Sequence, residues 1–286
     1  MSAADAVLDR PQWSVRPVST RLLRSELSLV FGRRRNQVIL AVLAAVPVLI
    51  AVAVKINSSD NGRGPVFFNS IAENGLFVSL AALFAITPLF LPLAVAVVSG
   101  DAIAGESNQG TLRYLLTVPV SRMRLLATKY AASVLYCFAA TLIVGVVGAA
   151  IGLILFPSGS VLLLSGSSTS LPAALLRILL ICLYLGLSMA ALAAIGLFIS
   201  TLTDYPVAAM AATAGLAVAS EVLDAIPQLA AIAPWLPTHW WFSFGDFLRD
   251  PITMQDSSTG VVSALVYIAI FTSLAWARFA GKDVSS

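Results

Sequence analysis

The stretch ILAVLAAVPVLIAVAV, residues 39–54, decides the fold class of this chain. Its side chains are apolar on every face of a helix, whereas a membrane β-strand would alternate polar and apolar residues. The composition agrees, because 59% of the residues are hydrophobic, only 11% are charged, and the mean hydropathy is +0.92. Soluble domains carry roughly 25% charged residues. We therefore predict an all-α polytopic membrane protein and exclude a β-barrel.

Six apolar runs have the character of membrane-spanning helices, which need roughly 20 residues each. They cover residues 37–54, 76–98, 130–156, 178–203, 206–220 and 260–277. An even number of spans places both termini on the same side of the membrane. We predict one transmembrane domain over residues 21–286, preceded by a flexible N-terminal tail over residues 1–20.

The positive residues predict the orientation, because Lys and Arg close to a span are retained in the cytoplasm. Most of the 17 lie before the first span, between the second and third spans, and after the sixth span. These are Arg10, Arg16, Arg21, Arg24, Arg33, Arg34, Arg35, Arg113, Arg122, Arg124, Lys129, Arg278 and Lys282. Both termini are therefore predicted to be cytoplasmic. Many Ala, Val and Arg residues and few Lys residues fit a GC-rich bacterial genome, so we expect the inner (plasma) membrane of a bacterium.

Several function classes are disfavoured by missing motifs. The sequence has no GxxxxGK[ST] loop to hold nucleotide phosphates, so we expect no ATPase or other enzyme activity in this chain itself. The single histidine, His239, has no neighbouring ligand set, and we predict no metal site. The positive residues lie beside spans, where anionic lipid accounts for them, so we expect contact with the lipid bilayer and no binding to nucleic acid. The six spans contain no charged residue, which disfavours an ion-coupled carrier.

A charged, turn-rich insert separates the second and third spans: SGDAIAGESNQGTLRYLLTVPVSRMRLLATK, residues 99–129. We expect Gly100 and Gly105 to loosen the helix that leaves the second span, and Gly110 to allow a sharp turn. A short helix, capped by Thr111, would then run to a stop at Pro119.

After this stop, Ser121 can cap the third span. Apolar and aromatic residues beside Arg113 suit docking of the short helix into a groove of a partner. An alternative is a topogenic loop that lies on the membrane surface, and chemistry alone weighs the two interpretations about evenly.

The insert resembles the corresponding loop of the type-2 ABC exporter permeases, which reads D-x-(I/V)-(A/S)-(G/x)-E-(x)3-G-T-L, then a short helix, then P-(V/x)-S-R and a lysine. The matching positions are Asp101, Glu106, Gly110, Thr111, Leu112, Pro119, Ser121, Arg122 and Lys129. The match covers about a tenth of the chain. The resemblance is greatest to the permeases of copper-processing, sodium-export and antibiotic-resistance operons.

This resemblance implies a permease subunit that forms the substrate path as a dimer, most simply a homodimer. It also implies two copies of a separate ABC ATPase, which would bind ATP and Mg²⁺, with no cofactor in this chain. The loop helix would couple the ATPase to the spans, and Glu106 would pair with Arg113 or with a base on the ATPase. The implied coupling residues are Asp101, Glu106, Gly110, Thr111, Leu112, Arg113, Tyr114, Leu115, Leu116 and Pro119.

The segment RLLRSELSLVFGRRRN, residues 21–36, mixes apolar and charged residues in the manner of an interfacial helix. Its arginines are Arg21, Arg24, Arg33, Arg34 and Arg35. In the permeases that the chain resembles, an element at this place also touches the ATPase. The alternative is a basic flank that only sets the topology.

Residues 221–259, between the fifth and sixth spans, are predicted to form short re-entrant helices in the outer leaflet and an outer gate, as in the resembled permeases. Re-entrant backbone requires shielding by protein, and tryptophans favour the membrane interface. The candidate gate residues are Glu221, Asp224, Trp235, His239, Trp240 and Trp241. Asp246 is a further candidate for steering substrate, but we favour the interpretation that these polar residues simply face water.

Three function classes stay open from the sequence. The first is the permease subunit of an ATP-driven exporter, the second is a secondary carrier or channel, and the third is an accessory membrane protein without transport. The missing charges in the spans weigh against the second class, and the structured insert weighs against the third. The cargo is not identified, although uncharged spans mildly favour a hydrophobic one.

Overall fold

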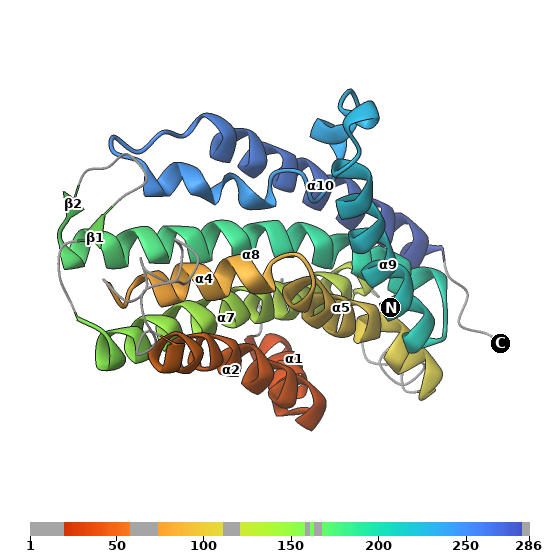
Figure 1. Cartoon of the computed structure of the whole chain (residues 1–286). Helices are drawn as coiled ribbons and strands as arrows, with labels where there is room; N and C mark the ends of the chain where they lie inside the picture. Colours follow the sequence, from red (N-terminus) through yellow and green to blue (C-terminus); the bar gives the residue numbers. More distant parts are fainter. Residues whose placement is uncertain (1–19, 58–73, 111–120, 158–160, 163–167, 282–286) are drawn as a thin grey trace, which may run out of the picture.

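A computed structural model of the chain describes residues 20–57, 74–110, 121–157, 161–162 and 168–281 (Figure 1). Its α-helices are α1 (Thr20–Gly32), α2 (Arg34–Asn57), α4 (Phe77–Ile86), α5 (Phe90–Asn108), α7 (Arg122–Leu155), α8 (Leu171–Leu202), α9 (Pro206–Asp224) and α10 (Gln255–Ala280). Six of them, α2, α5, α7, α8, α9 and α10, are long and apolar enough to cross a membrane. The predicted all-α fold with six spans is confirmed.

The second span differs from the prediction of one helix over residues 76–98. The chain forms α4, breaks over residues 87–89, and continues as α5. Pro88 lies in this break, where it removes a backbone donor and its ring would clash with the preceding turn of a continuous helix. At about 1.5 Å per residue, α4 is only about 15 Å long, so α5 is the spanning helix.

The other five spans extend beyond the predicted bounds. The largest additions are in α7, which has 34 residues, and in α8, which has 32. Each is about 50 Å long, more than the roughly 30 Å hydrocarbon core. The extra turns of α7 carry Arg122, Arg124 and Lys129, and those of α8 end in Arg177, and such charged residues lie outside spans that are chosen by hydropathy alone.

The long helix α8 forms the centre of the bundle and packs against α5, α7, α9 and α10 (Figure 1). Its middle is buried almost completely, with Leu185, Met189 and Ala193 each 0% exposed. In contrast, α2, α9 and α10 leave most of their spans uncovered by protein. Apolar residues on these outer helices therefore face the lipid or another chain.

The chain just before α4 approaches α7 closely at two glycines. A Cβ atom built on Gly152 would lie 1.9 Å from the carbonyl oxygen of Gly75. The amide of Gly75 donates to the carbonyl of Pro157 over 3.4 Å. Backbone contact of this kind is possible only without side chains, and it fixes α4 against α7.

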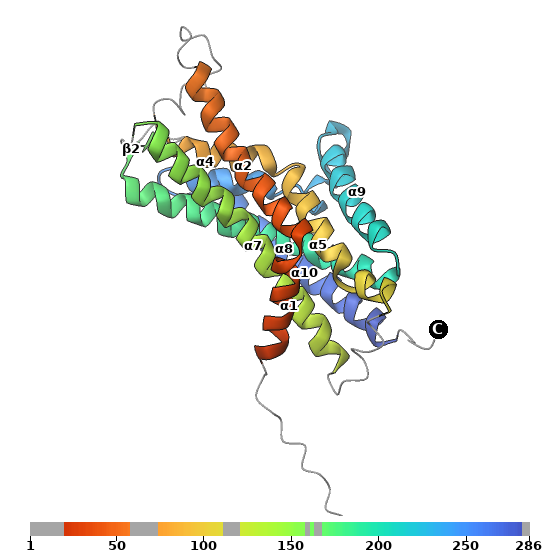
Figure 2. The same ribbon diagram turned by 90° about the horizontal axis from the view of Figure 1, so that it is seen from below.

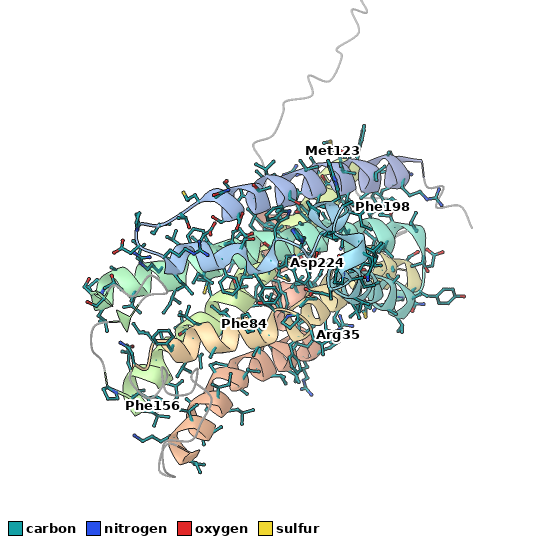
Figure 3. The ribbon with its side chains drawn as sticks, turned by 45° about the horizontal axis from the view of Figure 1, so that its top comes forward. Arg35, Phe84, Met123, Phe156, Phe198 and Asp224 are labelled. Atoms are coloured by element: carbon teal, nitrogen blue, oxygen red, sulfur yellow. The ribbon has the colours of Figure 1, made fainter. Side chains whose placement is uncertain are left out.

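The two ends of the bundle differ in content. One end, called the α1 end, holds α1, the last turns of α5 and α10, and the first turns of α7 (Figure 2). Arg122 of α7 donates there to the carbonyl of Ala280, and both ends of the described chain lie at this end. At the opposite end, called the far end, Lys55 of α2 donates to the carbonyl of Leu155. Figure 3 shows Met123, in the first turn of α7, and Phe156, which follows its last residue, at these opposite ends.

The far end also holds a short pair of strands. Strands β1 (Val161–Leu162) and β2 (Ser168–Thr169) form a short antiparallel pair. Between α9 and α10 the chain forms the 3-10 helices η1 (Pro227–Leu229), η2 (Ala233–Trp235) and η3 (Trp241–Leu248). Since η3 packs against α8 and α10, its backbone is shielded by protein, as a re-entrant segment requires.

Candidate functional site

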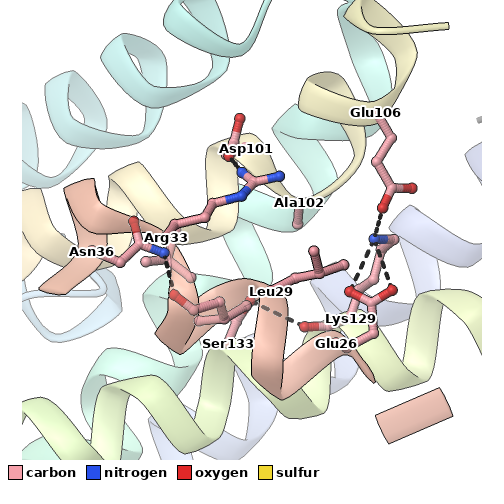
Figure 4. A pocket seen from close by; sticks show the side chains of 11 residues that line it. Glu26, Leu29, Arg33, Asn36, Asp101, Ala102, Glu106, Lys129 and Ser133 are labelled. Atoms are coloured by element: carbon pink, nitrogen blue, oxygen red, sulfur yellow. Dashed lines mark hydrogen bonds and ion pairs between the residues drawn. The ribbon is translucent and has the colours of Figure 1, made fainter. Parts of the chain in front are cut away.

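Six charged side chains gather at the α1 end and form what we call the ionic cluster: Glu26, Arg33, Arg35, Asp101, Glu106 and Lys129. They come from α1, the α1–α2 joint, α2, α5 and α7, and five of them surround one small pocket (Figure 4). Three are acidic and three are basic, so the cluster has no formal net charge. This balance allows charges to be buried between helices at tolerable cost.

Lys129 of α7 is the centre of the cluster, and its side chain is only 4% exposed. Its Nζ atom lies 3.3 Å and 3.2 Å from the two carboxylate oxygens of Glu26 in α1. The same Nζ atom donates to Oε1 of Glu106 in α5. A single ammonium group therefore joins three helices, which is possible because lysine has three donors on a flexible stem.

Asp101 lies one turn before Glu106 on the same helix and accepts from two arginines. Arg33 and Arg35 both donate to its Oδ2 atom, Arg35 over 2.9 Å. The Asp101 side chain is 10% exposed, whereas those of Arg33 and Arg35 are 37% and 43% exposed. Water therefore screens these two pairs more than it screens the Lys129 pairs.

The joint between α1 and α2 positions the arginines. The last carbonyl groups of a helix have no hydrogen-bond donors within the helix. Here side chains from the start of α2 donate to the last carbonyl groups of α1. Asn36 donates to the carbonyl of Val30 over 2.8 Å, and Gln37 donates to the carbonyl of Phe31 over 2.9 Å. Tyr136 of α7 donates to the carbonyl of Asn36 over 3.3 Å. The joint is thus held against α7.

The pocket inside the cluster has a volume of about 30 Å³. This is enough for water but far below the several hundred cubic ångströms of a pocket for a small-molecule ligand. The residues that the structure describes contain no group of three or more His, Cys, Asp or Glu side chains that could hold a metal ion. The arrangement is therefore suited to holding helices together or transmitting movement between them.

The cluster lies at the base of the segment 111–120, which is outside the described residues. Helix α5 ends at Asn108, and Gly110 follows with a φ of 68°, a left-handed conformation that glycine adopts readily. On the other side, Ser121 accepts from the amide of Arg124 over 3.4 Å and caps α7. The predicted turn at Gly110 and the predicted cap at Ser121 are confirmed.

Most of the predicted coupling residues fall in that segment, so they stay predictions: Thr111, Leu112, Arg113, Tyr114, Leu115, Leu116 and Pro119. The structure places Asp101 and Glu106 in the ionic cluster, with Lys129 as the described partner of Glu106. This contact between two motif positions, 23 residues apart, was not predicted from the sequence.

The prediction that Gly100 and Gly105 loosen α5 is wrong, because the helix continues through both. A Cβ atom on Gly100 would lie 2.7 Å from the backbone nitrogen of Met210, so this glycine admits α9 to close contact. A Cβ atom on Gly105 would lie 2.4 Å from Oδ1 of Asp101, so Gly105 makes room for a member of the cluster.

The predicted interfacial arginines divide into two groups. Arg21, Arg24 and Arg34 are exposed, whereas Arg33 and Arg35 turn toward Asp101. The opposite face of α1 carries Glu26, which is only 6% exposed. Helix α1 therefore differs from a simple amphipathic helix, because its inner face is not purely apolar and contributes the charge of Glu26 to the ionic cluster.

The candidate gate residues do not all come together. Asp224, at the end of α9, lies 2.5 Å from Nδ1 of His239, and Glu221 lies one turn earlier on α9. Trp240 packs edge-on against His239, whereas Trp235 is 80% exposed. This part of the predicted gate forms one group around the end of α9.

Trp241 differs from the expectation of a tryptophan at the membrane interface, because it is 2% exposed and lies in the hydrophobic core. Phe244 and Phe247 of η3 lie in the same core. The spacing of these three residues follows the turns of η3 and could have indicated a buried face.

Asp246 differs from both expectations, because it is 6% exposed and so does not face water, and its carboxylate oxygens bind groups of the chain itself. Its Oδ2 atom accepts from the amides of Asp256 and Ser257 over 3.0 Å and 2.9 Å, and its Oδ1 atom accepts from Thr253 over 3.2 Å. Asp246 therefore caps the first turn of α10 from a distant part of the chain. Burial alone would raise its pKa, but these hydrogen bonds outweigh burial and hold the pKa of Asp246 below its ordinary value.

The fold and the ionic cluster together define a class: a multi-pass α-helical membrane protein whose buried charges lie at the base of the loop between its second and third spans. A family model described as ABC-2 family transporter protein matches residues 31–284, and the chain belongs to this family. It is a membrane permease of an ABC transporter, and such permeases usually work with a separate ATPase subunit. A comparison with curated proteins found no match.

Proposed function

We propose that this chain is the permease subunit of an ATP-driven ABC exporter, and that it forms the substrate path as a homodimer with two copies of a separate ATPase. ATP and Mg²⁺ bind to the ATPase partner. The α1 end faces the cytoplasm of a bacterium, and the chain resides in the inner membrane. The family supports a permease, and the positive residues beside the spans support this orientation.

One observation carries the coupling part of the proposal. Lys129 joins Glu106 at the end of α5 to Glu26 of α1, and α5 and α7 are the two helices that flank the segment 111–120. A displacement of this segment by the ATPase acts on the ends of both helices. Because Lys129 is shared with α1, the same displacement also reaches the interfacial helix. Coupling requires a different set of contacts in each of two states. Lys129 can provide this difference, because it can bind Glu26 and Glu106 with different strength in the two states.

The same arrangement supports a role for α1 as a second contact with the ATPase. Its outer face presents Arg21 and Arg24, while its inner face presents Glu26 to the cluster. A partner that binds α1 therefore changes the position of a carboxylate beside Lys129. In this mechanism Thr111 to Leu116 form the docking helix and Glu106 transmits its movement. The group around Asp224 and His239 is part of the outer gate.

The test is affinity purification of the tagged full-length chain from its native membrane in mild detergent, followed by mass spectrometry and an ATPase assay. We expect a P-loop ATPase in about equal amount. Recovery of the chain alone, without nucleotide turnover, would contradict the proposal and favour a carrier or an accessory protein.

Matched variants then test the docking segment. Leu112→Asp and Leu115→Asp place a charge in the proposed contact and should abolish stimulation of the ATPase by the permease, with insertion unchanged. Gln109→Asp adds the same charge at an exposed position just before the segment and should have little effect. Equal stimulation in all three variants would contradict the docking assignment.

A further inference from the structure

An apolar groove runs between α10 and the chain that follows η1. It has a volume of about 460 Å³. One wall is formed by α10, and the other by η2 and the residues after it. The lining residues that matter for the argument are Trp235, Trp240, Val262, Val266, Tyr267 and Ile270. None of the described residues that line the groove is charged.

The polar side-chain atoms of Trp240 and Tyr267 in the groove already have partners. Trp240 donates from Nε1 to the carbonyl of Pro234 over 3.1 Å, and the hydroxyl of Tyr267 donates to the carbonyl of Trp235. Thr259 donates to the carbonyl of Gln255 over 3.2 Å. The groove therefore presents rings and aliphatic groups, and it suits an occupant that has no hydrogen-bonding groups.

The groove opens onto the outward face of a membrane span. Val262, Val266 and Ile270 are spaced four residues apart, so they form one stripe on α10, and they are 59%, 50% and 49% exposed. Such a stripe on a spanning helix meets the hydrocarbon of the bilayer. Trp235 is 80% exposed beside the groove. The groove is thus continuous with the lipid-facing surface.

The position along α10 assigns the groove to one leaflet. The helix begins at Gln255 at the far end, and the lining residues run from Thr259 to Ile270. At about 1.5 Å per residue they lie about 6 to 22 Å from the start of the helix. This range runs from the leaflet that is more distant from α1 to about the middle of a hydrocarbon core of roughly 30 Å.

We propose that this groove is a lipid site that holds one acyl chain of a membrane phospholipid from the leaflet distant from α1. An acyl chain is narrow, flexible and free of hydrogen-bonding groups, as the lining requires. It fills the space between α10 and the segment 234–240, which Tyr267 and Trp235 connect. Trp240 lies beside Gly260 near the start of α10, whereas Tyr267 binds Trp235 farther along the helix, so the headgroup lies toward the Thr259 end of the groove. This site does not depend on coupling to an ATPase.

The test uses quenching of tryptophan fluorescence by brominated lipid. The full-length protein carries Trp13→Phe, Trp235→Phe and Trp276→Phe, which leaves Trp240 in the groove and the buried Trp241. It is reconstituted into phosphatidylcholine vesicles with dibrominated or unmodified chains. We expect strong quenching of Trp240, because bromine quenches on contact, and no contribution from Trp241.

Two added substitutions separate the groove from the general lipid surface. Val266→Phe fills the groove and should remove most of the quenching. Leu265→Phe adds the same ring at the same depth, at a residue that is 52% exposed and does not line the groove, and should leave quenching unchanged. Circular dichroism and size-exclusion chromatography check that both variants fold.

Other occupants give different results. Absence of quenching at Trp240, or equal quenching in Val266→Phe and Leu265→Phe, would overturn the proposal. If a second copy of the chain fills the groove, Val266→Cys will form a disulfide-linked dimer in the membrane and Trp240 will not be quenched, and this too would overturn it.

Discussion

Lys129 and Glu106 form an ion pair that connects the end of α5 to the start of α7, on either side of the segment 111–120. The side chain of Lys129 is 4% exposed and that of Glu106 is 11% exposed, so water screens the pair weakly. The two helix ends are therefore held at a fixed separation, and Glu26 extends the connection to α1.

Removal of the shared cation should destabilise the protein strongly. Lys129→Met leaves the carboxylates of Glu26 and Glu106 facing each other in a buried site. We expect the free energy of unfolding to fall by about 3–5 kcal/mol, the usual result of breaking a buried ion pair on one side. The measurement is the fraction of protein that stays monodisperse in size-exclusion chromatography after heating.

The control for this prediction is the triple variant Glu26→Gln, Glu106→Gln, Lys129→Met, which removes the whole charge set and should recover most of the lost stability. If Lys129→Met withstands the same temperature as the unmodified protein, the burial of this cation is not what holds the three helices together.

The second half of the cluster should respond differently. Arg33→Ala leaves Arg35 at 2.9 Å from Asp101, and both arginines are more than a third exposed, so the expected loss is below about 1 kcal/mol. The double variant Arg33→Ala, Arg35→Ala should lose more than the sum of the two single variants, because each arginine compensates for the other. The measurement is thermal unfolding of the unmodified protein, the two single variants and the double variant. If the loss of stability in the double variant equals the sum of the two single losses, the two arginines act independently.

The sequence predicts the spans well because hydropathy is a property of each segment alone. It assigns α2, α9 and α10 correctly, and it identifies the turn at Gly110 from the residue type. Helices α7 and α8 begin before the predicted spans, because contacts with other parts of the chain hold Lys129 and Arg177 in their added first turns. Pro88 was visible in the sequence as a helix breaker, but hydropathy averaged over the window conceals it.

The site depends on contacts that no local pattern contains. Asp101, Glu106 and Lys129 were identified as motif positions, but their partners Arg33, Arg35 and Glu26 come from a segment more than sixty residues away. Charged residues near a span usually face water or lipid headgroups, so the sequence gives no reason to bury them. Only the packing of α1 against α7 shows that Glu26 faces inward.

The cap on α10 should make the stability of the far end depend on pH. The pKa of Asp246 lies below its ordinary value of 3.8 in the folded protein. The ionised carboxylate therefore stabilises the fold fully above about pH 4, and this contribution is lost as the pH falls through the lower, folded-state pKa. Asp246→Ala should lower stability at neutral pH by about 0.5–2 kcal/mol.

Asp246→Asn is the matched control, because asparagine can accept the same amide hydrogen bonds without titrating. We expect it to retain much of the stability at neutral pH and to lose less than the unmodified protein on acidification. The measurement is thermal unfolding of the detergent-solubilised protein between pH 7 and pH 3. Identical acid sensitivity of the unmodified protein and Asp246→Asn would exclude this carboxylate as the cause.

The contact between α4 and α7 should tolerate no side chain. In Gly152→Ala the new Cβ atom would lie 1.9 Å from the carbonyl oxygen of Gly75, and backbone cannot rotate away as a side chain can. The helices must move apart, and we expect the free energy of unfolding to fall by about 1–3 kcal/mol, seen as a lower unfolding temperature.

Gly215→Ala is the control, since nothing lies within 4 Å of the new methyl group and Gly215 is inside α9. There the change should stabilise the helix by about 0.5–1 kcal/mol, because alanine loses less backbone entropy than glycine. Opposite signs for the same chemical change would show that α4 is held by direct contact of two backbones, and equal shifts would contradict it.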